Sequence, residues 1–172
     1  MTNREDIDAY CRRMRNHGST VRSVHSFGFN SRLDDIHAAI LSVKLKYITK
    51  WTDRRREIAA RYTQGLKGTS FVLPTEPAGY RHAFHLYVIE HPKRDQLEKD
   101  MLNAGIDVKM HYPIAIHQQQ GFPWGKGAEV HPCPEAEKNA ARCLSLPMFP
   151  ELTNEEADYT IEQLVKWDKA QK

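Results

Sequence analysis

Apolar side chains recur at helical spacing in the first half of the chain. Between residues 33 and 62 they stand mostly three or four positions apart, at Leu33, Ile36, Ile40, Val43, Tyr47, Trp51, Ile58 and Tyr62. This spacing gathers them on one side of a helix and predicts that this side is buried. A single helix over residues 31–66 would be about 50 Å long, longer than most globular helices, so we expect a kink or a break in it.

Two short patterns predict where helices begin. Ser31 and Asp34 have the spacing of a capping box, in which the hydroxyl accepts a hydrogen bond from a first-turn N–H and the carboxylate reaches back. We therefore expect the long helix to start there. Thr153 and Glu156 repeat this spacing and predict a last helix. The side chains that would pack this last helix are Ala157, Ile161, Leu164 and Val165.

Shorter elements complete the pattern. We expect helices over residues 4–16, 93–104 and 134–142, strands over 84–89 and 106–112, a short extended segment at 144–146, and a long loop over 113–133. In the second strand, Asp107, Lys109 and His111 would share one face because side chains alternate along a strand. The order of these elements predicts an α+β fold, in which a long helix leads into a small sheet covered by helices.

Composition narrows the class of protein. The chain has 172 residues, 40% of them hydrophobic and 27% charged, which fits a globular protein of one domain or slightly more. No stretch approaches the roughly 20 consecutive apolar residues of a membrane span, and the first residues lack a signal-peptide pattern. We therefore expect a cytoplasmic protein without membrane association. Its three cysteines, Cys11, Cys133 and Cys143, are interpreted as reduced thiols.

Several chemistries find little support in the motifs. The nine histidines include no HExxH pattern and no close Cys/His pairing at ligand spacing, so a metal site is not expected. No phosphate-binding glycine loop or nucleophile elbow is present. Arg54, Arg55 and Arg56 would suit a nucleic-acid surface, and the whole chain carries a formal net charge of +3. Because Asp53 and Glu57 interrupt them, we favour a solvated helix face and expect no nucleic-acid partner.

Two clusters remain as candidate sites. Asn30, Ser31 and Arg32 place an amide, a hydroxyl and a guanidinium at the expected helix start, where backbone N–H groups attract anions. A purely structural cap is an equally good interpretation of Ser31. His111 and Tyr112 end the second expected strand and open the long loop, a common place for residues that line a cleft. Taken alone, such a pair is more often structural than catalytic.

Five segments in a fixed order resemble the DegT/DnrJ/EryC1/StrS family of sugar aminotransferases. They are TNREDIDAYCRRMRNHG, GFNSRLDDIHAAILSVKLKYITKWTDRRREIAARY, HAFHLYVIEHPKRDQL, GIDVKMHYPIAIHQQQGF and AEKNAARCLSLPMFPELTNEEADYTIEQL. The resemblance implies the C-terminal part of the type I aminotransferase fold. Residues 1–30 would end the large domain that binds pyridoxal phosphate (PLP), residues 31–68 would form a connecting helix or helix pair, and residues 69–172 would form the small domain.

The resemblance also implies a reaction, and it implies that this chain lacks the lysine that holds PLP. The family transfers an amino group through PLP, with glutamate the expected donor, to a keto group of a nucleotide-linked deoxysugar, and its members act as homodimers. The sequence leans toward the members that act at sugar C3. The lysine that holds PLP would precede the segment resembling TNREDIDAY, so we expect this chain to lack it. The alternative is a non-catalytic dimerisation or nucleotide-sugar-binding module.

Individual site residues follow from the matched motifs. Asn30 matches an asparagine that reaches the PLP phosphate of the partner subunit, with Arg32 beside it. His111, Tyr112 and His117 match the family's HYPxPxH segment near the substrate sugar. In this chain Ala115 stands where the motif has its second proline.

Overall fold

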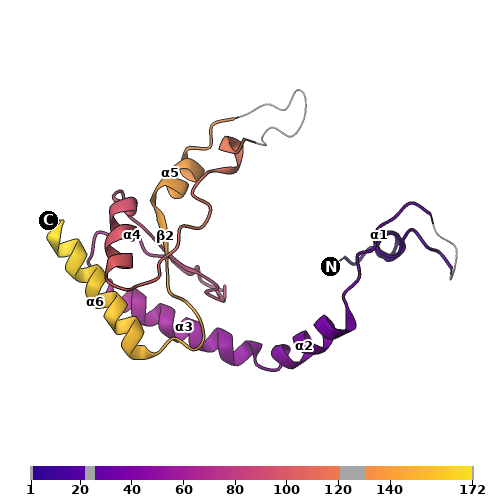
Figure 1. The fold of residues 1–172 in the computed structure, drawn as a ribbon, viewed down its shortest axis with the longest axis horizontal. Coiled ribbons are helices and arrows are strands. Elements are labelled where there is room, and N and C mark those ends of the chain that lie inside the picture. The colour runs from indigo at the N-terminus through magenta and orange to yellow at the C-terminus, as the bar shows by residue number, and fades with distance from the viewer. Residues whose placement is uncertain (1, 22–25, 121–130, 172) are drawn as a thin grey trace. The chain divides into compact units, whose positions relative to one another are not determined.

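The computed structural model describes residues 2–21, 26–120 and 131–171 (Figure 1). The α-helices are α1 (Glu5–Met14), α2 (Asp35–Leu45), α3 (Ile48–Gly65), α4 (Arg94–Asn103), α5 (Pro134–Arg142) and α6 (Asn154–Ala170). The strands are β1 (Tyr87–Glu90) and β2 (Cys143–Leu146), and a 3-10 helix, η1, covers Ile116–Gln118. The chain divides into two compact units, residues 1–48 and 49–172. The predicted α+β fold is confirmed.

The strand pair lies at the centre of the second unit. β1 and β2 are antiparallel, with Tyr87 opposite Leu146 and Glu90 opposite Cys143. All four residues of β2 are buried. Further backbone bridges join Val72 to Glu90 and Lys109 to Ser145, so β2 is paired along one edge by β1 and at one point of the other edge by Lys109.

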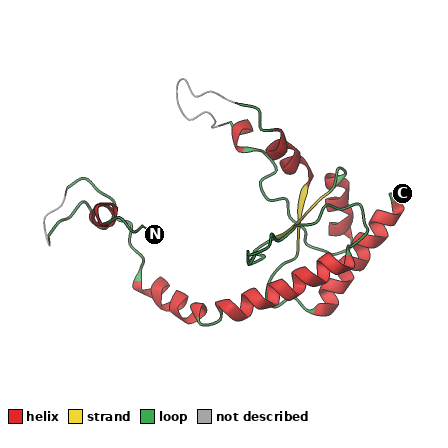
Figure 2. Cartoon of the chain, turned by 180° about the vertical axis from the view of Figure 1, so that it is seen from behind, coloured by secondary structure: helices red, strands yellow, loops and turns green. Residues whose placement is uncertain are grey.

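Helices cover this strand pair and form one hydrophobic core with it (Figure 2). α3, α4 and α6 each bury residues one turn apart because their apolar side chains recur every three or four positions. The buried helical side chains include Ile58, Ala59 and Tyr62 of α3, Leu97 and Met101 of α4, and Ala157, Leu164 and Trp167 of α6. Among the described helices, none is long and apolar enough to cross a membrane.

Three consecutive arginines fasten α3 to the rest of the second unit. Arg54 Nη2 donates to the carbonyl of Leu152 at 2.7 Å, and Arg55 Nη1 donates to the carbonyl of Met148 at 2.8 Å. Arg56 forms a two-pronged ion pair with Glu76, at 2.6 and 2.9 Å. The interpretation of this run as a solvated helix face was therefore wrong, because all three side chains are half-buried and bonded within the unit.

The expected break in the long helix is confirmed, but its expected start was wrong. α2 ends at Leu45 and α3 begins at Ile48. At the other end, Asp34 occupies the N-cap of α2 without a side-chain hydrogen bond. The capping box of Ser31 and Asp34 does not form, because the Ser31 N–H donates to the carbonyl of Arg15 at 2.9 Å and the segment stays extended.

The apolar side chains between residues 33 and 62 were predicted to be buried, and for the first half of this range the prediction was wrong. Ile58 and Tyr62 are buried, but Ile36 is 75% exposed and Ile40 is 52% exposed. No residue of α2 is buried within the described part of the chain. A contiguous exposed apolar surface of this kind is typical of a surface that another protein segment covers.

Extended segments are shorter than predicted where the backbone turns left-handed. Phe84 has a φ of 46° and Tyr112 a φ of 58°, and neither conformation continues a strand. β1 accordingly starts at Tyr87. The strand expected over residues 106–112 is reduced to the single bridge at Lys109, because the facing edge of β2 pairs only at Ser145. Of the loop expected over 113–133, residues 121–130 lie outside the described part.

The second capping box is confirmed and yields a stability prediction. Glu156 N donates to Thr153 Oγ1 at 3.1 Å, and Thr153 N donates to Glu156 Oε2 at 2.9 Å. We expect Thr153→Ala to lower the free energy of unfolding by about 1 kcal/mol, because a helix N–H loses its acceptor. Thr153→Ser keeps the hydroxyl and should retain most of the native free energy of unfolding. Equal stability of the alanine variant and the native chain in urea unfolding would contradict the capping role.

Alkaline unfolding should depend on Tyr62. Burial raises the pKa of its hydroxyl to about 12, against about 10 in an unfolded chain. Above pH 10 the unfolded state therefore loses this proton first, and the free energy of unfolding should fall by about 2 kcal/mol by pH 12. Tyr62→Phe should flatten that fall, at some cost at neutral pH since Tyr62 donates to the Pro147 carbonyl. If the free energy of unfolding of Tyr62→Phe fell with pH as steeply as that of the native chain, another group would cause the fall.

Candidate functional site

His111 is held by β2 through its ring and its backbone. Its Nδ1 lies 2.8 Å from Ser145 Oγ. The Cys143 thiol donates to the carbonyl of His111, with a sulfur–oxygen distance of 3.5 Å. Burial raises the pKa of this thiol, which keeps it protonated as a donor. Two alternate residues of one buried strand thus position His111.

His111 and Ser145 line a cavity of about 230 Å³ at the end of the strand pair. Asp107 and Lys109 line it as well, so the three residues expected on one strand face lie around one cavity, although the strand itself does not form. The remaining lining residues are mostly apolar: Leu86, Leu146, Pro147, Met148 and Phe149. An apolar wall with a few polar groups is the usual make-up of a small-molecule site.

Tyr112 follows His111 with an unusual backbone. Its φ of 58° is in the left-handed region, which is rare for a bulky residue and costs on the order of 1–3 kcal/mol. Its side chain is 85% exposed. Strained residues persist where the surrounding structure holds them, often at functional sites. An exposed aromatic ring in this position is available to a ligand or to a partner chain.

His117 faces α5. Its Nε2 lies 2.8 Å from Glu137 Oε1, and its side chain is 13% exposed. The same carboxylate oxygen accepts a hydrogen bond from Cys133 N at 3.4 Å. The contact therefore attaches η1, just beyond Tyr112, to the first turns of α5.

Asn30 and Arg32 belong to the first unit. A backbone bridge pairs Asn30 with Asn16, and both Asn30 and Arg32 are exposed. Within the described residues, the side chains of Asn30 and Arg32 make no hydrogen bond. The geometry expected for them, beside the first turn of a helix, was wrong, because they lie in the extended segment that precedes the Asp34 cap.

Sequence reasoning missed the residues that support the candidate site. Ser145, Cys143 and Glu137 were not identified as site residues, although they contact His111 and His117. One signal was present: Ser145 is a polar residue between two leucines in a short segment expected to be extended. A buried hydroxyl in such a strand requires a hydrogen-bond partner.

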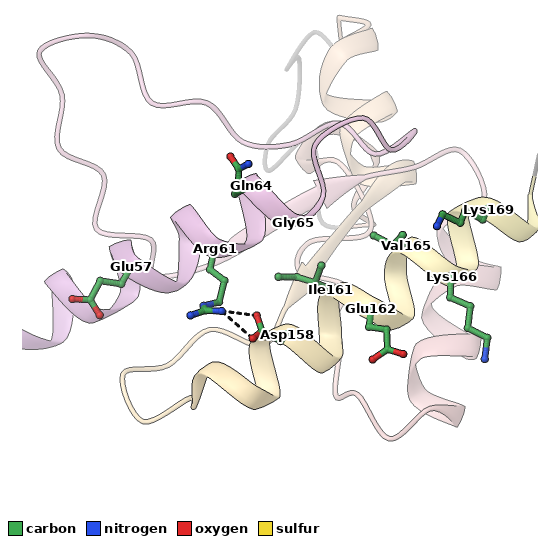
Figure 3. Close-up of a pocket in the computed structure, with 10 residues that line it drawn as sticks. All are labelled: Glu57, Arg61, Gln64, Gly65, Asp158, Ile161, Glu162, Val165, Lys166 and Lys169. Carbon is green, nitrogen blue, oxygen red and sulfur yellow. Dashed lines mark hydrogen bonds and ion pairs between the residues drawn. The ribbon is translucent and has the colours of Figure 1, made fainter.

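A larger groove lies between α3 and α6, with a volume of about 970 Å³ (Figure 3). Arg61 and Asp158 pair across one end, at 2.7 and 2.9 Å. Gly65 allows close packing of the two helices, since a Cβ there would lie 2.7 Å from Ile161 Cγ2. None of the predicted site residues lines this groove. It is thus separate from the cavity of His111.

Comparison with known proteins identifies a family. The model of the DegT/DnrJ/EryC1/StrS aminotransferase family matches residues 1–165. A relative from Geobacillus stearothermophilus, named a pleiotropic regulatory protein, is 42% identical over 97% of this chain and 46% of its own length. The UDP-N-acetyl-3-dehydro-alpha-D-glucosamine 3-aminotransferase of Acidithiobacillus ferrooxidans is 41% identical over 88% of this chain and 40% of its own length.

Solved structures agree with this match. DesV of S. venezuelae, solved in complex with a ketimine intermediate, has a TM-score of 0.91 and 32% identity, covering 98% of this chain and 46% of DesV. NtdA of Bacillus subtilis, solved with bound cofactor PMP, has a TM-score of 0.83 and 28% identity, covering 98% of this chain and 41% of its own. The chain thus spans less than half the length of these relatives.

The contact between His117 and Glu137 predicts a local effect. Glu137→Ala should release η1 from α5, because His117 loses its partner on that helix. We expect faster amide hydrogen exchange over residues 116–119, with little change in the melting temperature. Glu135→Ala, on the same helix turn but paired with Lys138 at 3.5 Å, is the matched control. Equal exchange in the two variants would show that the contact does not hold η1.

Proposed function

The chain belongs to the DegT/DnrJ/EryC1/StrS aminotransferase family, and we propose that it forms the C-terminal portion of a PLP-dependent enzyme that aminates a nucleotide-linked keto-deoxysugar. The observation that carries the proposal is the match over residues 1–165 to a family of sugar aminotransferases. The relatives named for amination at C3 of UDP- or dTDP-linked sugars favour that carbon. Glutamate is the proposed amino donor.

The described residues suit a separate role for each unit, with PLP bound by the first and the sugar by the second. Asn30 and Arg32 offer an amide and a guanidinium that no neighbour in the described structure engages, and both groups bind phosphate oxygens well. We assign them to the phosphate of PLP, with Asn30 serving the partner subunit of a homodimer. When bound, PLP carries the amino group between donor and acceptor.

The second unit would hold the sugar. His111 offers a ring nitrogen in a cavity with polar and apolar walls, and Tyr112 offers an exposed ring and hydroxyl. A sugar presents hydroxyl and carbonyl oxygens as well as apolar C–H faces, which match these groups. His117, whose Nε2 is engaged by Glu137, would contribute mainly by fixing the loop that begins at Tyr112.

The lysine that carries PLP is proposed to lie outside these 172 residues. Lys44, Lys46 and Lys50 are all exposed. A reactive lysine normally has a lowered pKa because a pocket desolvates it. These three side chains therefore lack the setting that PLP chemistry requires.

Covalent trapping of PLP tests the proposal. The 172-residue chain is mixed with PLP, reduced with borohydride and mapped by peptide, and we expect no single lysine to be labelled stoichiometrically. Joined to the N-terminal portion of the A. ferrooxidans relative, it should bind PLP at a lysine of that portion and aminate a UDP-linked 3-keto sugar. Stoichiometric labelling of one lysine in the chain alone would overturn the proposal, as would a joined protein that binds PLP but aminates no nucleotide sugar.

A mixed dimer tests the role of Asn30. In the joined protein, Asn30→Ala should weaken PLP retention about tenfold or more, because a hydrogen bond to a charged phosphate contributes about 1.5–3 kcal/mol. Asn16→Ala is the control, since it removes the amide opposite Asn30 and leaves their backbone bridge in place. A dimer of one Asn30→Ala subunit and one subunit without the PLP lysine should bind PLP normally at its remaining site. Weak binding there would place Asn30 in the site of its own subunit.

One observation favours the alternative of a non-catalytic module. The relative that is 42% identical is named for regulation and not for catalysis. A module of this kind would bind a nucleotide sugar or dimerise without PLP. It would give a joined protein in which the sugar binds and no amine is transferred.

A further inference from the structure

Ser145 makes its side-chain hydrogen bond to one atom, Nδ1 of His111. The residue is buried in the centre of β2, with 4% of its surface exposed. Its backbone N–H and carbonyl are both used by Lys109, at 2.8 and 3.1 Å. Among the described residues, the Ser145 hydroxyl has no hydrogen-bond partner other than His111, at 2.8 Å. This pairing determines where the proton of a neutral His111 lies.

A buried hydroxyl needs an acceptor for its hydrogen, whereas an unused lone pair on its oxygen costs less free energy. If His111 carried its proton on Nδ1, the ring would donate to Ser145 and leave the hydroxyl hydrogen without an acceptor in the described structure. If the proton is on Nε2, Nδ1 is a lone-pair acceptor and the hydroxyl donates to it. Only the second arrangement satisfies both groups, since the bond made by one ring nitrogen fixes the role of the other.

We propose that Ser145 is a positioning residue that holds neutral His111 with its proton on Nε2, so that His111 presents an N–H donor to its ligand. The inference rests on the proposed function for the identity of that ligand, a carbonyl or hydroxyl oxygen of the sugar. The thiol of Cys143 holds the backbone of His111 at the same time. Two residues of β2 thereby fix the ring position, the tautomer and the backbone of His111.

Nitrogen NMR of the 172-residue chain labelled with ¹⁵N-histidine measures the tautomer directly. Above pH 8, long-range proton–nitrogen correlations should show His111 with a protonated Nε2 and an unprotonated Nδ1. Ser145→Ala should lower the ratio of the two tautomers about three- to tenfold, the range expected for one neutral hydrogen bond. Ser145→Thr keeps the hydroxyl and should restore the native ratio.

Thr160→Ala is the matched control, because Thr160 is as buried as Ser145 and its hydroxyl bonds within α6. This variant should lose stability and leave the tautomer of His111 unchanged. A proton on Nδ1 in the native chain would overturn the inference, and so would an unchanged ratio in Ser145→Ala while that variant remains folded by circular dichroism.

Titration of the joined protein with a UDP-linked sugar separates this inference from the proposed function. If both hold, the sugar shifts the Nε2 resonance of His111, and Ser145→Ala raises KM more than it lowers kcat. If the tautomer changes as expected but the sugar leaves the His111 resonances unmoved, Ser145 positions His111 and the proposed substrate role of His111 is wrong.

Discussion

The antiparallel pairing of β1 with β2 is the constraint on which the second unit depends. β2 is buried at all four positions and is bonded along both edges, by β1 and by Lys109. Buried backbone groups must be paired, so this strand can occupy only the place between those two neighbours. Because Ser145 and Cys143 alternate with core leucines, the register that packs the core also directs their polar atoms to His111.

The two units differ in how far they bury their apolar side chains and pair their polar groups internally. In the second, the helices bury their apolar faces and the arginines of α3 bond to carbonyls and a carboxylate of the same unit. In the first, α2 leaves Ile36 and Ile40 exposed. The chain spans 46% of the length of its Geobacillus relative. The apolar surface of α2 thus has no cover within the described part of the chain.

Sequence patterns predicted those features that local chemistry decides. Residues 134–142 were predicted as a helix and form α5 with the same bounds, since Pro134 suits a first turn, and the Thr153 capping box starts α6 as expected. Contacts distant in sequence decided the rest. Ser31 fails as a cap because Arg15 takes its N–H, and Ser145 reaches His111 across 34 positions. Asn30 and His111 stood out as candidates from local patterns, but their expected roles came from the family resemblance, which local periodicity could not supply.

Hydrogen exchange of the β2 amides tests the central claim most directly. If the strand pair holds the second unit together, the amides of residues 144–146 and of Lys109 should exchange only through global unfolding, at least as slowly as the central amides of α6. Their exchange should respond to urea with the slope of complete unfolding. Faster exchange at β2 than in α6, with a shallow urea dependence, would show that the helices hold the unit together without the strands and would contradict the account.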